Sequence, residues 1–166
     1  NVTVIPGRFD TITSSSGYSI IIDNAHTPTA LQNILETIKE FVKGKIITVF
    51  GCGGDRDKTK RPIMGEIAGI YSDYCIITSD NPRTEDPLVI IDEIETGIGK
   101  TKCKYDKIED RKTAIYKALE TARKGDVIVI AGKGHEDYQI FKDETIYFND
   151  KVVVMNYLIK QKLLKL

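Results

Sequence analysis

The 166-residue chain contains no tryptophan, only two methionines and two histidines, and no net charge, because 24 basic residues balance 24 acidic ones. Without a basic excess, the chain lacks the electrostatic footprint that nucleic acid or an anionic membrane requires. No apolar run approaches the roughly 20 residues of a membrane helix, and no signal peptide pattern follows Asn1. We therefore expect a fragment of a cytoplasmic protein that binds neither nucleic acid nor membrane.

Cysteine and histidine are too few and too dispersed to suggest a metal site. Cys52, Cys75 and Cys103 are odd in number and far apart in the sequence. Neither His26 nor His135 has a cysteine or a second histidine at ligand spacing. We predict buried free thiols and no structural zinc.

Strand-like apolar runs alternate with amphipathic helical runs through most of the chain. The runs at residues 18–22 and 46–50 predict strands, and the segment between them predicts a helix with Thr27 as N-cap, Pro28 at the first turn and Gly44 at its end. Its apolar residues recur at helical spacing: Leu31, Ile34, Leu35, Ile38, Phe41 and Val42. This is a strand, helix, strand unit.

The alternation continues to about residue 131. Helices are predicted around 62–71, after Pro87, and after the capping residue Asp110 with Gly125 at the end. Strands are predicted at 74–77, 103–108 and 127–131. The tail predicts a hairpin from 138–141 and 145–148, and a final helix capped by Asp150. The fold class is therefore α/β, a doubly wound and mostly parallel Rossmann-like sheet with a C-terminal hairpin and helix.

Two glycine-containing segments imitate nucleotide-binding motifs. Gly99-Lys100-Thr101 resembles the end of a P-loop, but the first glycine of that motif would fall at Ile94, and the segment follows a helix instead of a strand. Glycines ending a helix at Gly97 and Gly99 account for it. Residues 51–54 match half a dinucleotide fingerprint, whose third glycine would fall at Arg56. No phosphate loop is predicted.

Opposite charges follow two of the predicted strands. One strand runs into residues 78–83, which end in Arg83, and another runs into the glycine-rich residues 132–136, which end in Glu136. The carboxyl ends of parallel strands are where an open α/β sheet binds its ligand. Arg83 would pair with an anionic group and Glu136 with an ammonium, so the predicted ligand is an amino acid carrying both charges.

Five motifs together resemble the C-terminal domain of the Mur ligases, and particularly of the members that add diaminopimelate. They are GRFD at 7–10, DNAHTP at 23–28, GCGGDRDKTKRP at 51–62, DNPR at 80–83 and GKGHEDYQ at 132–139, so the resemblance covers about residues 7–150. It implies that residues 1–166 form one domain of a bacterial three-domain ligase. The central ATPase domain and the N-terminal UDP-binding domain would lie outside this chain.

The resemblance implies an ATP- and Mg²⁺-dependent ligase of peptidoglycan synthesis. It would add meso-diaminopimelate to UDP-MurNAc-L-Ala-D-Glu through an acyl phosphate, and the C-terminal domain would close over the site and present the attacking amine. Because the phosphate loop is missing, we expect no catalytic residue in this chain, no ATP hydrolysis by the isolated fragment and no tightly bound nucleotide.

The resemblance also assigns roles to individual residues. Arg8, Asp23 and His26 would lie on the nucleotide side, with the alternatives that Arg8 is a surface residue and His26 caps a helix. Asn24 stands where the family commonly has tyrosine. The residues expected at the diamino acid are Arg56, then Asn81 and Arg83 at its distal carboxylate, then the Gly132 carbonyl and Glu136 at its ammonium. Asp80 would orient the arginines, and Lys58, Lys60 and Arg61 would form a solvated loop face.

Other ligands and functions remain open at this point. Lanthionine has the same two ends as diaminopimelate and is not distinguished by these residues. A folylpolyglutamate synthase shares the ligase architecture, although DNPR argues against it. A free-standing small-molecule binding module and a doubly wound oxidoreductase are further alternatives, and the oxidoreductase lacks a complete glycine fingerprint.

Overall fold

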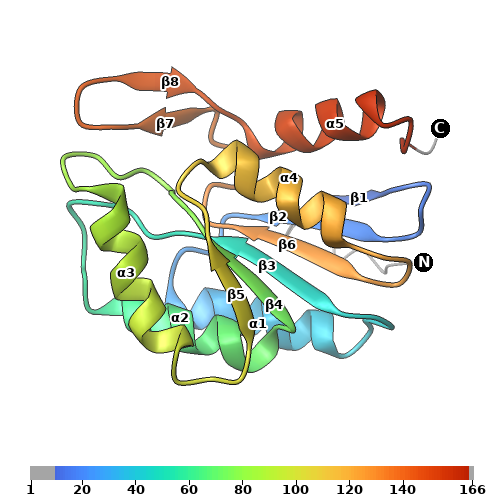
Figure 1. Cartoon of the computed structure of the whole chain (residues 1–166), viewed down its shortest axis with the longest axis horizontal. Coiled ribbons are helices and arrows are strands. Elements are labelled where there is room, and N and C mark those ends of the chain that lie inside the picture. Colours follow the sequence, from blue (N-terminus) through green and yellow to red (C-terminus); the bar gives the residue numbers. More distant parts are fainter. Residues whose placement is uncertain (1–9, 165–166) are drawn as a thin grey trace.

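The computed structural model describes residues 10–164, in which six strands form one sheet in the order β1-β2-β6-β3-β4-β5 (Figure 1). Strand β1 is antiparallel to β2, and the other neighbouring strands are parallel. The strands are β1 Asp10–Thr13, β2 Ser19–Asp23, β3 Ile46–Phe50, β4 Tyr74–Ile77, β5 Lys104–Lys107 and β6 Val127–Ala131. A separate antiparallel hairpin pairs β7 Tyr138–Ile140 with β8 Thr145–Tyr147.

Within residues 10–164, five helices cover both faces of the sheet (Figure 1). They are α1 Pro28–Lys39, α2 Lys60–Tyr71, α3 Pro87–Ile98, α4 Arg111–Thr121 and α5 Asp150–Lys160. Helices α1, α2 and α3 pack against one face, and α4 and α5 pack against the other. The predicted doubly wound α/β fold with a C-terminal hairpin and helix is confirmed.

The central strands β3 and β6 are buried along their whole length because both of their faces are covered, and Thr48 is their one polar residue. All five residues of β3 and all five of β6 are buried, as expected for strands inside a parallel sheet. The edge strand β5 instead exposes Lys104 and Lys107, which discourages pairing with another chain. Strand β1, at the other edge, was not predicted as a separate element.

Local capping signals are confirmed at two helix starts. Thr27 Oγ1 accepts a hydrogen bond from Ala30 N at 3.2 Å at the start of α1, and the Asp110 side chain accepts one from Thr113 N at 2.9 Å at the start of α4. The predicted cap of α5 is wrong by one residue, because Asn149 accepts from Val152 N and Asp150 is already helical.

Three of the four glycines predicted to end helices, Gly44, Gly97 and Gly125, do not do so. Helix α1 ends at Lys39, whereas Gly44 donates its backbone N–H to Gly125 O at 2.9 Å. Gly125 has φ +87 and shapes the turn into β6. Gly97 lies inside α3, where a Cβ would fall 1.7 Å from Pro62 O of α2. Only Gly99 caps a helix as predicted.

The three cysteines are free, as predicted, but they differ in burial. Cys52 and Cys75 are buried, and burial raises the pKa of the Cys52 thiol to about 12. Cys103 is only half-buried, which corrects the prediction, because it precedes the edge strand β5.

The connections that follow the carboxyl ends of the strands run to opposite faces of the sheet. Loops after β2, β3 and β4 lead to α1, α2 and α3 on one face, whereas β6 leads through the hairpin to α5 on the other face. Neighbouring strands whose connections diverge leave a crevice between them, which is the usual ligand site of such sheets. No helix within residues 10–164 has the length and apolar character needed to cross a membrane.

Candidate functional site

Two adjoining clefts lie at the carboxyl edge of the sheet. The first has a volume of about 610 Å³ and brings together all the residues expected at the diamino acid, with Asp80 and His26 beside them. The second has a volume of about 560 Å³ and contains Asp23 and His26 from the expected nucleotide side. His26, Gly132 and Glu136 line both clefts, so the two are continuous.

The DNPR loop is held in an unusual backbone conformation. Arg83 has φ +54, a left-handed value that is uncommon for a residue with a side chain. Its backbone N donates to Ile140 O at 2.9 Å, and its Nη1 donates to Gly54 O at 3.0 Å. A Cβ on Gly54 would lie 1.8 Å from Pro82 O, so this glycine permits the approach of the loop after β3. The side chain of Arg83 thereby lines the first cleft.

Asn81 and Glu136 contact each other, and both also contact a lysine that the sequence analysis did not single out. Asn81 is 2% exposed, and its Nδ2 donates to Glu136 Oε1 at 3.3 Å. Lys133 Nζ donates to Asn81 Oδ1 at 2.9 Å and to Glu136 Oε1 at 3.1 Å. The position of Lys133 between two glycines in a strand-end loop was the signal that could have identified it.

Gly132 and Asp80 are in close contact across the first cleft. Gly132 has φ +117, and a Cβ there would lie 2.6 Å from Asp80 Oδ2. The backbone of Asp80 is held by Gln139, whose Nε2 donates to Asp80 O at 2.9 Å. Among residues 10–164 no ion pair joins Asp80 to Arg56 or Arg83, so its role in orienting them stays a prediction.

Arg111 is a second buried cation that the sequence analysis missed. Its guanidinium donates to Ser79 O at 3.0 Å and to Ala131 O at 3.2 Å, the carbonyls that precede the DNPR and GKGHEDYQ loops. Burial lowers the pKa of Arg111, but the charge of Asp150 and that of Asp80 outweigh this effect and keep the pKa above its usual value. Arg111 therefore stays charged beneath the cleft. A lone arginine at a helix start gave no signal for this role.

The basic residues before α2 and in its first turn include both exposed and buried side chains. Arg56 is exposed and lines the first cleft, and Lys60 Nζ donates to His26 O at 2.7 Å. The prediction that Arg61 lies on a solvated face is wrong, because its side chain has no exposed surface and pairs with Glu85 at 2.8 Å and Glu93 at 2.9 Å. Arg61 therefore connects α2 to the DNPR loop and α3.

On the nucleotide side, Asp23 ends β2 and His26 is exposed in the following loop. Asp23 Oδ2 accepts from Ala25 N at 2.9 Å. His26 Nδ1 lies 2.7 Å from Asn24 O, so this nitrogen carries the proton and donates to the carbonyl. The alternative that His26 caps α1 is wrong, since Thr27 does so. Arg8 lies outside the described residues.

Metal ligands are not gathered at this edge. Within residues 10–164 no group of three or more histidine, cysteine, aspartate or glutamate side chains is placed to hold a metal ion.

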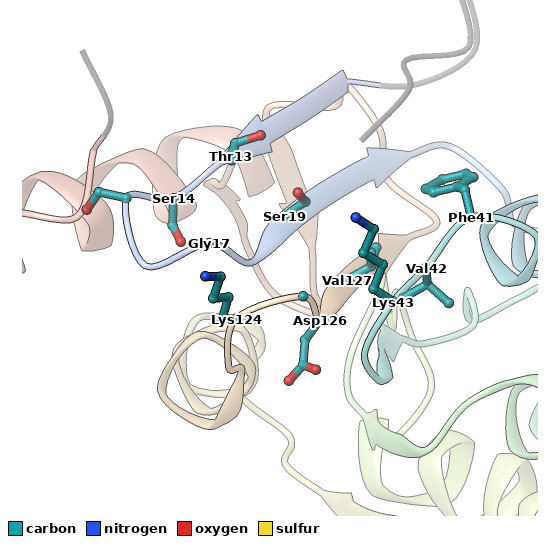
Figure 2. A pocket seen from close by; sticks show the side chains of 12 residues that line it. Thr13, Ser14, Gly17, Ser19, Phe41, Val42, Lys43, Lys124, Asp126 and Val127 are labelled. Carbon is teal, nitrogen blue, oxygen red and sulfur yellow. The ribbon is translucent and has the colours of Figure 1, made fainter. Parts of the chain in front are cut away.

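A third cavity, of about 370 Å³, lies at the amino ends of the parallel strands, where β2 and β6 begin (Figure 2). The two clefts lie at the other ends of these strands. Lys43, Lys124 and Asp126 line it. Both carboxylate oxygens of Asp126 already accept backbone hydrogen bonds, from Lys45 N and Arg123 N. None of the predicted site residues described here lines this cavity.

Comparison with known proteins gives consistent matches. The family model described as "Mur ligase, glutamate ligase domain" matches residues 7–134. A UDP-N-acetylmuramoyl-L-alanyl-D-glutamate--2,6-diaminopimelate ligase of Clostridium botulinum is 55% identical over 152 residues, which are 90% of this chain and 31% of the relative. The chain thus spans about a third of the length of the curated relatives it matches.

Solved structures agree with these matches. A structure of a UDP-N-acetylmuramoyl-L-alanyl-D-glutamate--2,6-diaminopimelate ligase superposes with a TM-score of 0.90 at 42% identity, covering 97% of this chain and 33% of that one. FolC of E. coli in complex with ADP gives a TM-score of 0.60 at 18% identity, covering 96% of this chain and 32% of that one. The likeness to FolC shows a shared fold alone.

Proposed function

The chain belongs to the Mur ligase family, and we propose that it is the domain that binds and positions the incoming diamino acid in an ATP-dependent peptidoglycan-precursor ligase. The proposed reaction joins meso-diaminopimelate to UDP-MurNAc-L-Ala-D-Glu. The observation that carries this proposal is one cleft that is lined by two arginines, Arg56 and Arg83, and also by Glu136 and Gly132.

The two ends of an amino acid find complementary groups in this cleft. Arg83 offers a planar guanidinium, and Asn81 Nδ2 is an N–H donor, so both suit a carboxylate. Glu136 and the carbonyl of Gly132 are acceptors that suit an ammonium. A diaminopimelate side chain ends in both groups, whereas the lysine side chain ends in an ammonium alone. The guanidinium therefore favours the former and repels the latter.

The second cleft is the proposed contact with the nucleotide. Asp23 and His26 would line the nucleotide side of the interdomain cleft, and Arg8, which is outside the described residues, is proposed to contact the same nucleotide. The described residues do not fit a Mg²⁺ site, because no cluster of acidic ligands is present. We therefore assign no step to Mg²⁺ in this chain and expect the phosphate loop and the metal site in another part of the ligase.

Residues 1–166 are proposed to act as a single domain that contributes positioning instead of bond-making groups. Holding an amine in line with an activated carboxyl group replaces a bimolecular encounter with an intramolecular one and lowers the barrier. The second cleft lies beside the amino-acid cleft. A single closure of this domain would therefore complete the nucleotide pocket and, at the same time, present the amine of the amino acid.

The experiment that tests this function compares amino acids in the full-length ligase that contains this chain. With UDP-MurNAc-L-Ala-D-Glu and ATP, meso-diaminopimelate is expected to give a tripeptide product, detected by mass, with matching phosphate release. Lanthionine is expected to react as well, because replacing a methylene by sulfur changes little in a pocket of this kind. Preferential use of L-glutamate on a folate acceptor would instead support the folylpolyglutamate synthase alternative.

A further inference from the structure

A fully buried lysine lies beneath the two loops that form the amino-acid cleft. The side chain of Lys133 has no exposed surface, and its Nζ binds both Asn81 Oδ1 and Glu136 Oε1. The same ammonium lies 5.5 Å from the centroid of the Tyr138 ring. Only the lysine side of this ion pair is buried, and even fully buried pairs are weak evidence for stability, since replacing both partners with apolar residues is often as stable. Its contacts with two proposed ligand-binding residues therefore point to a role in the cleft.

Lys133 and the backbone N–H of Ile140 together decide which end of the Asn81 amide faces the carboxylate of Glu136. Asn81 Oδ1 accepts from Lys133 Nζ at 2.9 Å and from Ile140 N at 3.1 Å. The amide nitrogen cannot accept from these two donors, so the two ends of the side chain cannot be exchanged. Nδ2 is then turned to Glu136, 3.3 Å from Oε1. Asn81 thus presents a donor, as recognition of a carboxylate requires.

Lys133 also fixes one of the two carboxylate oxygens of Glu136. Within residues 10–164, both Lys133 and Asn81 bind Oε1, while 38% of the Glu136 side chain remains exposed. Oε2 is therefore the oxygen available to an ammonium. The turn that joins the two residues is fixed by Glu136 N donating to Lys133 O at 3.0 Å and by Gly134 at φ +54.

The charges around the cleft make a lone ammonium a poor ligand. The fully charged residues that line it cancel, with Arg56, Lys60 and Arg83 against Asp57, Asp80 and Glu136. Lys133, which lines the adjoining second cleft and pairs with Glu136 of the first, adds one positive charge. A zwitterionic group has no net charge and is not disfavoured by this excess, whereas an ammonium without a carboxylate is repelled.

From these contacts we propose that Lys133 is a positioning residue that sets the preference of the cleft for the zwitterionic end of a diamino acid. Together with Ile140 N it fixes Asn81 as the donor, it holds Glu136 as the acceptor, and its charge disfavours a lone ammonium. This inference rests on the proposed function of the same cleft and adds the group that determines its selectivity.

The test replaces Lys133 in the full-length ligase and measures the ratio of kcat/KM for meso-diaminopimelate to kcat/KM for L-lysine. In Lys133→Met this ratio is expected to fall about tenfold or more, because a charge-assisted hydrogen bond network and one repulsive charge are lost. Lys133→Arg keeps the charge and the donors and should retain most of the ratio. The matched control is Lys142→Met, since Lys142 is exposed in the turn between β7 and β8.

A second arm tests whether Lys133 acts through Asn81. In an Asn81→Ala background, Lys133→Met is expected to lower the diaminopimelate specificity constant by a smaller factor than it does in the wild type, because residues that act as one unit are not additive. The remaining loss reports the contact of Lys133 with Glu136. Thermal unfolding of each variant verifies folding. Should the methionine variant not fold, Lys133→Gln removes the charge while keeping a donor and gives the same comparison.

The outcomes separate this inference from the function on which it rests. Equal losses for both amino acids, with an unchanged ratio, would show that Lys133 is only structural and would overturn the inference. Full additivity with Asn81→Ala would also overturn it. A wild-type ligase that does not prefer diaminopimelate to lysine would instead refute the proposed function itself.

Discussion

Arg111 and Asp150 form a two-point ion pair with no exposed surface, and this pair joins α4 to α5 beneath the cleft. Arg111 Nε donates to Asp150 Oδ1 at 2.8 Å, and its Nη2 donates to Oδ2 at 2.9 Å. The same guanidinium also binds the carbonyls at which the chain leaves β4 and β6. One buried cation therefore connects the C-terminal helix to both cleft loops.

Breaking this pair from one side should strongly destabilise the fold. Arg111→Met leaves the Asp150 carboxylate buried without its partner, and we expect the free energy of unfolding to fall by about 3–5 kcal/mol. Urea denaturation measures the change. The double variant Arg111→Met with Asp150→Leu should recover part of the loss, because it leaves no unpaired charge. A double variant less stable than Arg111→Met alone would contradict this account.

The pair between Glu85 and Arg61 should make stability depend on pH in the acidic range. The Arg61 hydrogen bond lowers the pKa of Glu85 from 4.5 to about 2. A group whose pKa is lower in the folded state contributes stability above its unfolded pKa and loses it as the pH falls through its folded pKa. The stability difference between the wild type and Glu85→Gln should therefore be full above about pH 5 and decline toward pH 2. Denaturation at several pH values checks this, and a difference independent of pH would argue against the pairing.

Arg83 should determine whether the ligase accepts a distal carboxylate. In the full-length enzyme, Arg83→Ala removes a charge-assisted contact, and apparent affinity for diaminopimelate should fall by roughly 30-fold to several thousandfold, or about 2–5 kcal/mol. Use of L-lysine should fall little or even rise. The ratio of the two specificity constants is the measurement, with Arg123→Ala, outside both clefts, as the control. An equal loss for both amino acids would make Arg83 structural.

Residues 1–166 alone should not turn over ATP. Gly99 caps α3 and the chain then enters β5, so Lys100 lies in a helix-to-strand connection where a phosphate loop has no place. A phosphate-release assay on the purified chain should give the background rate, and Lys100→Ala should not change it. Turnover that depends on Lys100 would refute this interpretation.

Much of the fold followed from the sequence because its signals are local. Alternating apolar runs, the Thr27 and Asp110 caps and the glycine-rich strand ends each act within a few residues, so strands β3 and β4 were predicted with their observed bounds. The motifs also placed Arg56, Arg83 and Glu136 at the same edge of the sheet, and the first cleft contains all three. Their contacts with a ligand remain predictions.

Only the tertiary structure decided which charged side chains are buried. Arg61, Arg111 and Lys133 look like ordinary surface residues in the sequence, yet their side chains have no exposed surface. Their partners Glu85, Asp150 and Asn81 lie 24, 39 and 52 residues away in the chain. Burial of a charge depends on whether distant elements bring an opposite charge or acceptor to it. Periodicity and short motifs do not identify the distant partner of a buried charge.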